Sequence, residues 1–279
     1  MGSKGKTTFL KVLLVVAAVF ASSAQAESVV RVGGAGSGLG AMKILAGAYE
    51  KAHPGVRIQL FPSLGSSGGI KALLTGALDL AISARPLKRE ERKAGAVQRE
   101  YARTPLLFAA NNSVRKADLT TRELEKIYLG QMLTWPDGSQ IRLVLRPDGD
   151  TDTQIVKGIS AAMERAVKAA AARPGMILAV TSQECSDTLA NVSGALGPST
   201  LTEIIAERRS PQVLSYNGVR PTLKALADGS YPLVKPHYLV TMSKTPAAAQ
   251  QFALFVATAQ GRALLAKTGN LVLPAGKGH

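Results

Sequence analysis

Apolar and polar stretches alternate along the first third of the chain in an order that predicts strands and helices in turn. Apolar-rich strands are expected at residues 28–32, 56–61 and 80–82, and apolar residues at helical spacing predict helices at 39–49 and 70–78. This order predicts a parallel α/β sheet. The loops that carry functional groups then gather at the carboxyl edge of the strands.

Two turns rich in glycine and serine stand at that predicted edge. The first strand ends in GGAGSGLG at residues 33–40, and the second leads into GSSGG at residues 65–69. Each turn precedes a helix, whose first N–H groups lack internal partners and carry partial positive charge, so each can receive an anion. Ser83 ends the third strand and would lie beside these two turns at the same edge of the sheet. The simpler alternative is that these segments are only loops.

A dinucleotide site is a weaker interpretation of the same residues. Gly36, Gly38 and Ala41 fit a loose G-x-G-x-x-A pattern. The pattern also needs an acidic residue about 20 positions later to bind the ribose. Residues 59–62 read QLFP at that place, so we treat the match as accidental.

Later segments extend the α/β pattern. Residues 88–103 are predicted to form a charged helical surface, 104–110 a buried strand, 155–172 one helix, and 247–268 a pair of helices. Between them the turn RPDGDTDT at 146–153 precedes a helix, like the two turns above, and begins with an arginine.

The first 26 residues differ from the remainder. A lysine-containing start, an apolar run and a small-residue AQA ending are typical of a secretory signal peptide at 1–26. No later apolar segment has the length of a membrane span. The mature chain is therefore expected to be soluble, exported and periplasmic.

The amino-acid composition limits the classes of ligand and partner that this protein is expected to bind. The net charge of +15 favours anions, but the basic residues are dispersed and only 5% of residues are aromatic, so we expect no nucleic-acid partner. Cys185 is the only cysteine, which excludes an internal disulfide. His53, His237 and His279 have no ligand spacing, so we expect no metal and no cofactor.

Several blocks in sequence order resemble the periplasmic phosphate-binding proteins of ABC importers. They are GSSGGIKALLTGALDLAISARPL, LTTRELEKIYLGQMLTWPDG, the turn headed by Arg146, SYNGVRPTLKALADGSYPLVKPHYLVT and FALFVATAQGRALLAKTGNLVLP. The resemblance implies the two-lobed type 2 periplasmic binding protein fold, each lobe a mainly parallel sheet flanked by helices, with two hinge crossovers.

Lobe I would comprise residues 27–108 plus 236–279, and lobe II residues 109–235. The function implied is capture of a small oxyanion, phosphate by resemblance, in the cleft between the lobes and delivery to an inner-membrane ABC permease. The family also implies a monomer, and lobe closure on binding.

The resemblance also implies a set of ligand-binding residues. Gly38 and Leu39 would donate backbone N–H groups, Ser66 its hydroxyl and N–H, and Arg146 a charged contact. The remaining candidates lie in the same three turns or at the end of the third strand: Ser67, Ser83, Asp150, Thr151 and Asp152.

Asp150 and Asp152 depart from the family pattern, which has hydrogen-bond donors at this turn. Ionised carboxylates only accept hydrogen bonds and repel a phosphate dianion. Three explanations stay open: the aspartates cap the next helix and point away from the cleft, the ligand carries a proton that an aspartate accepts, or tight phosphate binding has been lost. In some family members a carboxylate after the third strand accepts the ligand's proton, and Ala84 stands at that place here.

Two other function classes remain as alternatives. The first is a secreted ligand-sensing or adhesive module that keeps the fold but has lost or changed phosphate binding. The second is an enzyme with Ser66 or Ser83 as nucleophile. We expect no enzyme, because no histidine lies in a motif predicted to face the cleft.

Overall fold

The computed structural model describes residues 27–273, so the predicted signal peptide lies outside the described residues. Twelve strands alternate with helices. The strands are β1 (Ser28–Gly34), β2 (Val56–Ser63), β3 (Leu80–Ser83), β4 (Ala96–Ala110), β5 (Asp118–Leu119), β6 (Arg142–Leu145), β7 (Ile177–Leu178), β8 (Ala195–Thr200), β9 (Gln212–Val213), β10 (Ser215–Tyr216), β11 (Val234–Met242) and β12 (Leu271–Val272).

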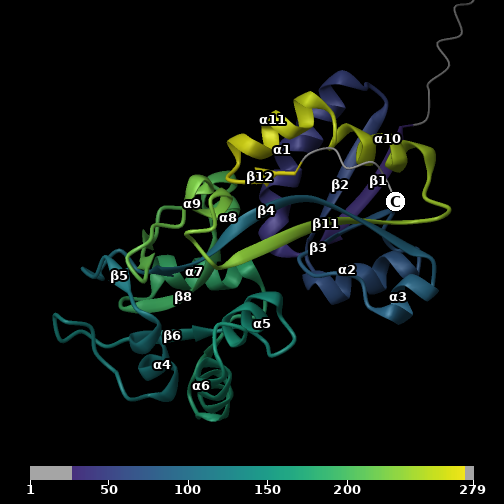
Figure 1. The fold of residues 1–279 in the computed structure, drawn as a ribbon. Coiled ribbons are helices and arrows are strands. Elements are labelled where there is room, and N and C mark those ends of the chain that lie inside the picture. The colour runs from purple at the N-terminus through teal and green to yellow at the C-terminus, as the bar shows by residue number, and fades with distance from the viewer. Residues whose placement is uncertain (1–26, 274–279) are drawn as a thin grey trace, which may run out of the picture.

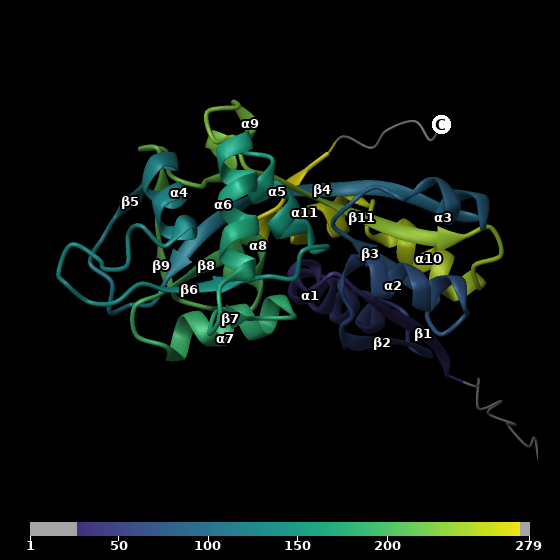
Figure 2. The ribbon, with the colours of Figure 1, turned by 90° about the horizontal axis from the view of Figure 1, so that it is seen from below.

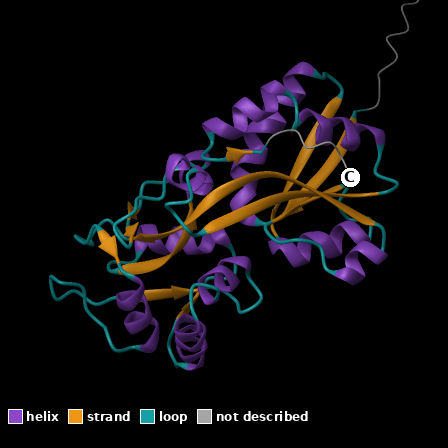
Figure 3. Ribbon diagram, in the orientation of Figure 1, coloured by secondary structure: helices purple, strands orange, loops and turns teal. Residues whose placement is uncertain are grey.

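The helices lie on the outside of the sheet (Figure 3). They are α1 (Gly36–Ala52), α2 (Gly65–Leu74), α3 (Arg89–Lys93), α4 (Thr121–Leu129), α5 (Thr151–Lys157), α6 (Ala161–Ala172), α7 (Ser182–Asn191), α8 (Leu201–Ala206), α9 (Leu223–Ala227), α10 (Ala247–Phe255) and α11 (Ala259–Lys267). Within residues 27–273, no helix has both the length and the apolar character needed to cross a membrane.

One large sheet connects the whole molecule in the order β2-β1-β3-β11-β4-β8-β6-β7. The strands β2-β1-β3 at one end and β8-β6-β7 at the other are parallel, as predicted. Between them β11 and β4 are antiparallel to each other and to their outer neighbours. Figure 1 shows β4 and β11 running together from one end of the molecule into the other.

The strand β4 changes partner along its length. Residues 96–105 pair with β11, and residues 106–110 pair with β8. Thr104 marks the change: its hydroxyl donates to the Gly269 carbonyl at 3.0 Å and accepts from the Thr202 N–H at 3.1 Å. Three distant segments are thus tied together where the chain passes between the two ends of the sheet.

Side chains of β4 and β6 alternate between two cores. Leu106 and Phe108 pack with α4 and α6, whereas Leu107 and Ala109 pack with α7 on the other face. Figure 2 shows α6 and α7 on opposite sides of β6. A strand directs successive side chains to opposite faces, so this one apolar run builds both cores.

The parallel strands at the other end are also covered on both faces. Leu80 and Ile82 of β3 pack in a core with α1, α10 and α11, and Ala81 lies in the core that α2 covers. A strand buried on both faces reads as a continuous apolar run, which is how LAIS appears in the sequence.

Two sequence predictions of secondary structure were wrong. Helix covers only Arg89–Lys93 of the predicted helix at 88–103, and β4 begins at Ala96, because residues 96–103 pair along β11. The predicted helix at 155–172 is two helices, since Ser160 caps α6 by accepting from the Met163 N–H at 2.9 Å. The predicted pair at 247–268 is confirmed as α10 and α11.

Candidate functional site

The strand β11 fixes the relative positions of two helix N-termini. His237 Nε2 lies 3.1 Å from Ser37 Oγ at the start of α1. The ammonium of Lys235 pairs with Asp152 at the start of α5. Lys235 and His237 are two residues apart and share one face of the strand, about 7 Å from each other. The first turns of α1 and α5 therefore lie side by side along this strand.

The start of α1 is buried and, within residues 27–273, has no side-chain cap at Ala35. Its preceding residue, Ala35, donates its N–H to the Ile82 carbonyl of β3 at 2.9 Å. Gly38 is packed so closely that a Cβ there would lie 2.8 Å from Ile82 Cγ2. The absence of a side chain at Gly38 thus lets the first turn of α1 approach β3.

The start of α2 lies next to that of α1. Leu64, which precedes α2, donates its N–H to the Gly34 carbonyl at 3.1 Å, and no side chain in the described region caps the helix. Ser66 Oγ accepts from the Ala84 N–H at 2.9 Å. The first turns of α1 and α2 and the end of β3 consequently form one edge, as the sequence predicted.

Two of the predicted serines already form hydrogen bonds within the protein beside this edge. Ser83 is fully buried, and its hydroxyl donates to the Arg85 carbonyl at 2.7 Å. Ser67 Oγ accepts from Arg85 Nη2 at 3.1 Å. Arg85 is also paired with Glu91. The hydroxyl of Ser83 therefore stabilises its own turn, whereas that of Ser67 is bound by a half-buried arginine.

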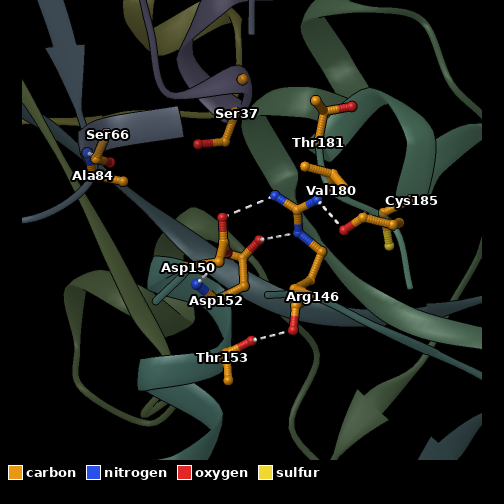
Figure 4. Close-up of polar contacts among 12 residues, drawn as sticks. Ser37, Ser66, Ala84, Arg146, Asp150, Asp152, Thr153, Val180, Thr181 and Cys185 are labelled. Atoms are coloured by element: carbon orange, nitrogen blue, oxygen red, sulfur yellow. Dashed lines mark hydrogen bonds and ion pairs between the residues drawn. The ribbon is translucent and has the colours of Figure 1, made fainter. Parts of the chain in front are cut away.

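Arg146 follows β6 and is buried among acceptors from its own chain. Its Nη2 donates to Asp150 Oδ2 at 2.9 Å, and its Nη1 donates to the Ala179 carbonyl at 2.7 Å. Its Nε lies 3.8 Å from Asp152 Oδ2. Figure 4 shows the guanidinium between the two aspartates on one side and Val180 on the other. With Lys235 and Asp152, the group contains two positive and two negative charges.

Asp150 has two structural contacts. One carboxylate oxygen accepts from the Asp152 N–H at 2.9 Å and caps α5, and the other accepts from Arg146. The capping contact proposed from the sequence is therefore present, but the carboxylate also engages the arginine. Burial raises the pKa of Asp150, and the nearby Asp152 charge raises it further. Thr151 is the first residue of α5, beside this cap.

A fourth helix N-terminus, which the sequence analysis did not identify, lies beside the start of α1. The helix α7 is capped by Thr181, which accepts from the Glu184 N–H. Gln183 Nε2 donates to the Gly36 carbonyl at the start of α1 at 3.2 Å. The motif TSQE is a capping box, S/T-x-x-E, and this pattern could have located the start of α7.

One histidine contacts a residue of these turns that the sequence analysis did not connect with it. His237 is fully buried and contacts Ser37, 200 positions away. Lys235 was missed as well. Both belong to β11, and nothing in the residue pattern indicates which helix a strand side chain will meet.

A groove of about 920 Å³ opens beside the contact between α1 and α7. Leu39 lines it from α1, and Thr181 and Gln183 line it from the α7 side. Leu39 is thus the one predicted ligand-binding residue that lines this groove. The groove gives solvent a path to the junction of the two helix N-termini.

Comparison with known proteins identifies the family. Residues 21–260 match the family model described as the PBP superfamily domain. The chain belongs to the PBP superfamily. Its fold is that of the type 2 periplasmic binding proteins, as predicted, with two lobes and two crossing strands.

Relatives of this PBP-superfamily protein include two curated bacterial proteins. The phosphate-binding protein PstS of Bacillus subtilis is 26% identical over 229 residues, covering 77% of this chain and 72% of the relative. The phosphate-binding protein PstS of Borreliella burgdorferi is 22% identical over 233 residues, covering 80% and 82%.

A solved structure supports the same fold. A Clostridium perfringens protein, described as a phosphate ABC transporter substrate-binding protein with bound phosphate, superposes with a TM-score of 0.76 at 22% identity. The match covers 88% of this chain and 100% of that one.

Proposed function

We propose that this protein is a periplasmic solute-binding protein that captures a small oxyanion, phosphate, between its lobes and delivers it to an inner-membrane ABC permease. The superfamily match covers most of the chain. The two curated relatives are named phosphate-binding proteins, and the Clostridium protein holds phosphate. The predicted export signal at 1–26 agrees with this location.

The junction of α1 and α2 is the observation that carries the proposal. Two helices begin beside the same strand edge without side-chain caps at their N-cap residues in the described region. The first N–H groups of such helices stabilise an anion through hydrogen bonds and the helix dipole. In this proposal Gly38 and Leu39 donate backbone N–H groups, Ser66 and Ser67 donate from α2, and Ser83 supports the edge.

The turn headed by Arg146 forms the opposite wall of the site. Figure 4 shows Ser66 and Ser37 on one side of the gap, and Asp150 with Arg146 on the other. Because Asp150 and Asp152 balance Arg146 and Lys235, this wall adds hydrogen-bonding groups without net charge. In this proposal Thr151 contributes the first N–H group of α5, whereas the Asp152 N–H is held by the Asp150 cap. The affinity should therefore depend on ligand protonation.

Lobe closure is the proposed mechanism. Within residues 27–273, the proposed lobes are the described parts of 27–108 plus 236–279 and of 109–235, with β4 and β11 connecting them. The contact of Gln183 Nε2 with the Gly36 carbonyl joins the two proposed lobes beside the groove. The protein acts as a monomer, and no covalent step is part of the proposal.

A thermal-shift screen tests this function. Mature protein should melt at a higher temperature with millimolar phosphate, since a ligand at 100 times its Kd adds about 2.7 kcal/mol to stability. Sulfate, a phosphonate and pyrophosphate serve as comparisons, and chloride at matched ionic strength is the control. Phosphate that leaves the melting temperature unchanged at millimolar concentration would contradict the proposal.

A further inference from the structure

A chain of buried hydrogen bonds leads from the body of the lobe to Ser37. It passes from Ser37 to His237, Asn270 and Thr268, and it ends at the Leu265 carbonyl. All five residues are at most 4% exposed. A carbonyl oxygen only accepts hydrogen bonds, so this end of the chain has one possible direction.

The direction of the next two links follows from that carbonyl. The Thr268 hydroxyl donates to Leu265 at 2.8 Å, so Thr268 Oγ1 accepts from Asn270 Nδ2 at 3.1 Å. Asn270 Nδ2 also donates to the Thr268 carbonyl at 3.3 Å, which fixes the orientation of the amide. The Asn270 carbonyl oxygen must then face the histidine ring.

The orientation of Asn270 selects the tautomer of His237. Asn270 Oδ1 lies 3.3 Å from His237 Nδ1, which must carry the proton to make this bond. In a neutral imidazole the other nitrogen is an acceptor. Burial and the nearby Lys235 charge lower the pKa of His237 to about 4, against smaller opposing contributions from Asn270 and Asp152, so the ring is neutral near pH 7.

His237 Nε2 therefore accepts the hydroxyl proton of Ser37 at 3.1 Å. Ser37 stands in the first turn of α1, where a serine would ordinarily donate to an anion. Here its proton points into the protein, and only its lone pairs remain for a ligand. Figure 4 shows the Ser37 oxygen between the start of α1 and the Asp150 carboxylate.

We propose that Ser37 is a specificity residue that accepts a hydrogen bond from the ligand, and that His237 and Asn270 are positioning residues that hold it as an acceptor. This inference rests on the proposed function. The site then favours an oxyanion that carries a proton, such as hydrogen phosphate. Sulfate carries no proton near neutral pH and would place an oxygen against the lone pairs of Ser37.

The tautomer of His237 is a direct test that needs no ligand. Long-range ¹H–¹⁵N spectra of the full mature protein should show a neutral ring protonated at Nδ1. The signals are assigned by their loss in His237→Gln. A ring protonated at Nε2 would overturn the inference, because Ser37 would then be free to donate to the ligand.

Ser37→Ala tests the effect on binding. By calorimetry near pH 7 we expect phosphate affinity to fall about tenfold, the worth of one hydrogen bond, while sulfate affinity stays the same or rises. Equal losses for both anions would overturn the inference, since they would mark Ser37 as a donor. The control is Ser243→Ala, an exposed serine in the turn after β11, which should leave both affinities unchanged.

The two levels of the proposal fail in different ways. Wild-type protein that binds neither anion would overturn the proposed function, and this inference with it. Wild-type protein that binds phosphate, combined with an unchanged phosphate-to-sulfate ratio in Ser37→Ala, would overturn only the role of Ser37.

Discussion

Arg146 carries the charge that an oxyanion site would be expected to offer to its ligand, yet Asp150 already occupies one of its terminal nitrogens. A second nitrogen is bound to the Ala179 carbonyl. The guanidinium is thus oriented and neutralised before any ligand arrives. Its main effect is to hold the α5 turn in place, and the charge that reaches the ligand depends on Asp150.

Removing the Asp150 charge should strengthen phosphate binding. Asp150→Asn retains a capping oxygen for α5 but removes the negative charge. A unit charge at about 4 Å contributes about 1 kcal/mol in water and about 4 kcal/mol near a protein surface, so we expect affinity to rise at least about fivefold by calorimetry. Asp150→Ser should act in the same direction.

Asp148→Asn is the matched control on the same turn. The side chain of Asp148 is 74% exposed and pairs with Lys157, so solvent screens its charge and the affinity should change little. An unchanged affinity in Asp150→Asn as well would mean that this carboxylate serves only as a cap.

The residues of the site were predictable to different degrees. The three turns and Arg146 were found because each turn precedes a helix within a few positions of sequence. The contacts of Ser37 with His237 and of Asp152 with Lys235 were not found, because they join residues 200 and 83 positions apart. No local pattern indicates such pairs, and only the sheet order brings them together.

At the scale of elements, the helix α2 is held unusually close to β1. A Cβ at Gly69 would lie 2.5 Å from Gly34 Cα. This is a backbone atom, so it cannot move away as a flexible side chain could. The GSSGG motif therefore has a packing role in addition to the anion-binding role inferred from the sequence. Gly69 lets the first turn of α2 reach the edge that it shares with α1.

Gly69→Ala should therefore lower stability by about 1–3 kcal/mol, the usual effect of overpacking, when measured by denaturant unfolding. Gly47→Ala in α1 is the matched control. Nothing lies within 4 Å of a Cβ at Gly47, so that change should stabilise the helix by about 0.5–1 kcal/mol. If Gly69→Ala were as stable as wild type, the close approach of α2 to β1 would have to be wrong.

The pair of helices at 247–268 was predicted correctly from its apolar spacing, whereas the first half of β4 was not. Its second half, residues 104–110, is a continuous apolar run and was predicted as a strand. Its first half, beginning at Ala96, contains charged residues that suit a helix, but pairing with β11 decides its conformation. Tertiary pairing overrides local propensity at such positions.

At the scale of the whole molecule, a buried acid makes stability depend on pH. Glu203 of α8 is 2% exposed, and its carboxylate accepts from Ser186 Oγ at 2.6 Å. Burial raises its pKa from 4.5 to about 7. Between pH 4.5 and about pH 7, the carboxyl group of Glu203 is ionised in the unfolded chain but still protonated in the folded protein. The free energy of unfolding therefore falls as the pH rises through this range, by about 3 kcal/mol in all.

Glu203→Gln should remove this dependence. The amide can still accept from Ser186, so the variant should be more stable than wild type above about pH 7 and equal to it below the ordinary value of 4.5. Denaturant unfolding at about pH 4.5 and about pH 8 measures the difference. Glu164→Gln, at an exposed glutamate paired with Lys168, should show no such pH-dependent gain.

The place of β11 in the sheet determines when the protein can finish folding. This strand is made late in synthesis, yet it lies between β3 and β4, which are made early. Until it arrives, two neighbouring strands present unpaired backbone edges, and His237 is not yet there to orient Ser37. The contacts that hold Ser37 at the start of α1 are therefore completed only after β11 has been synthesised.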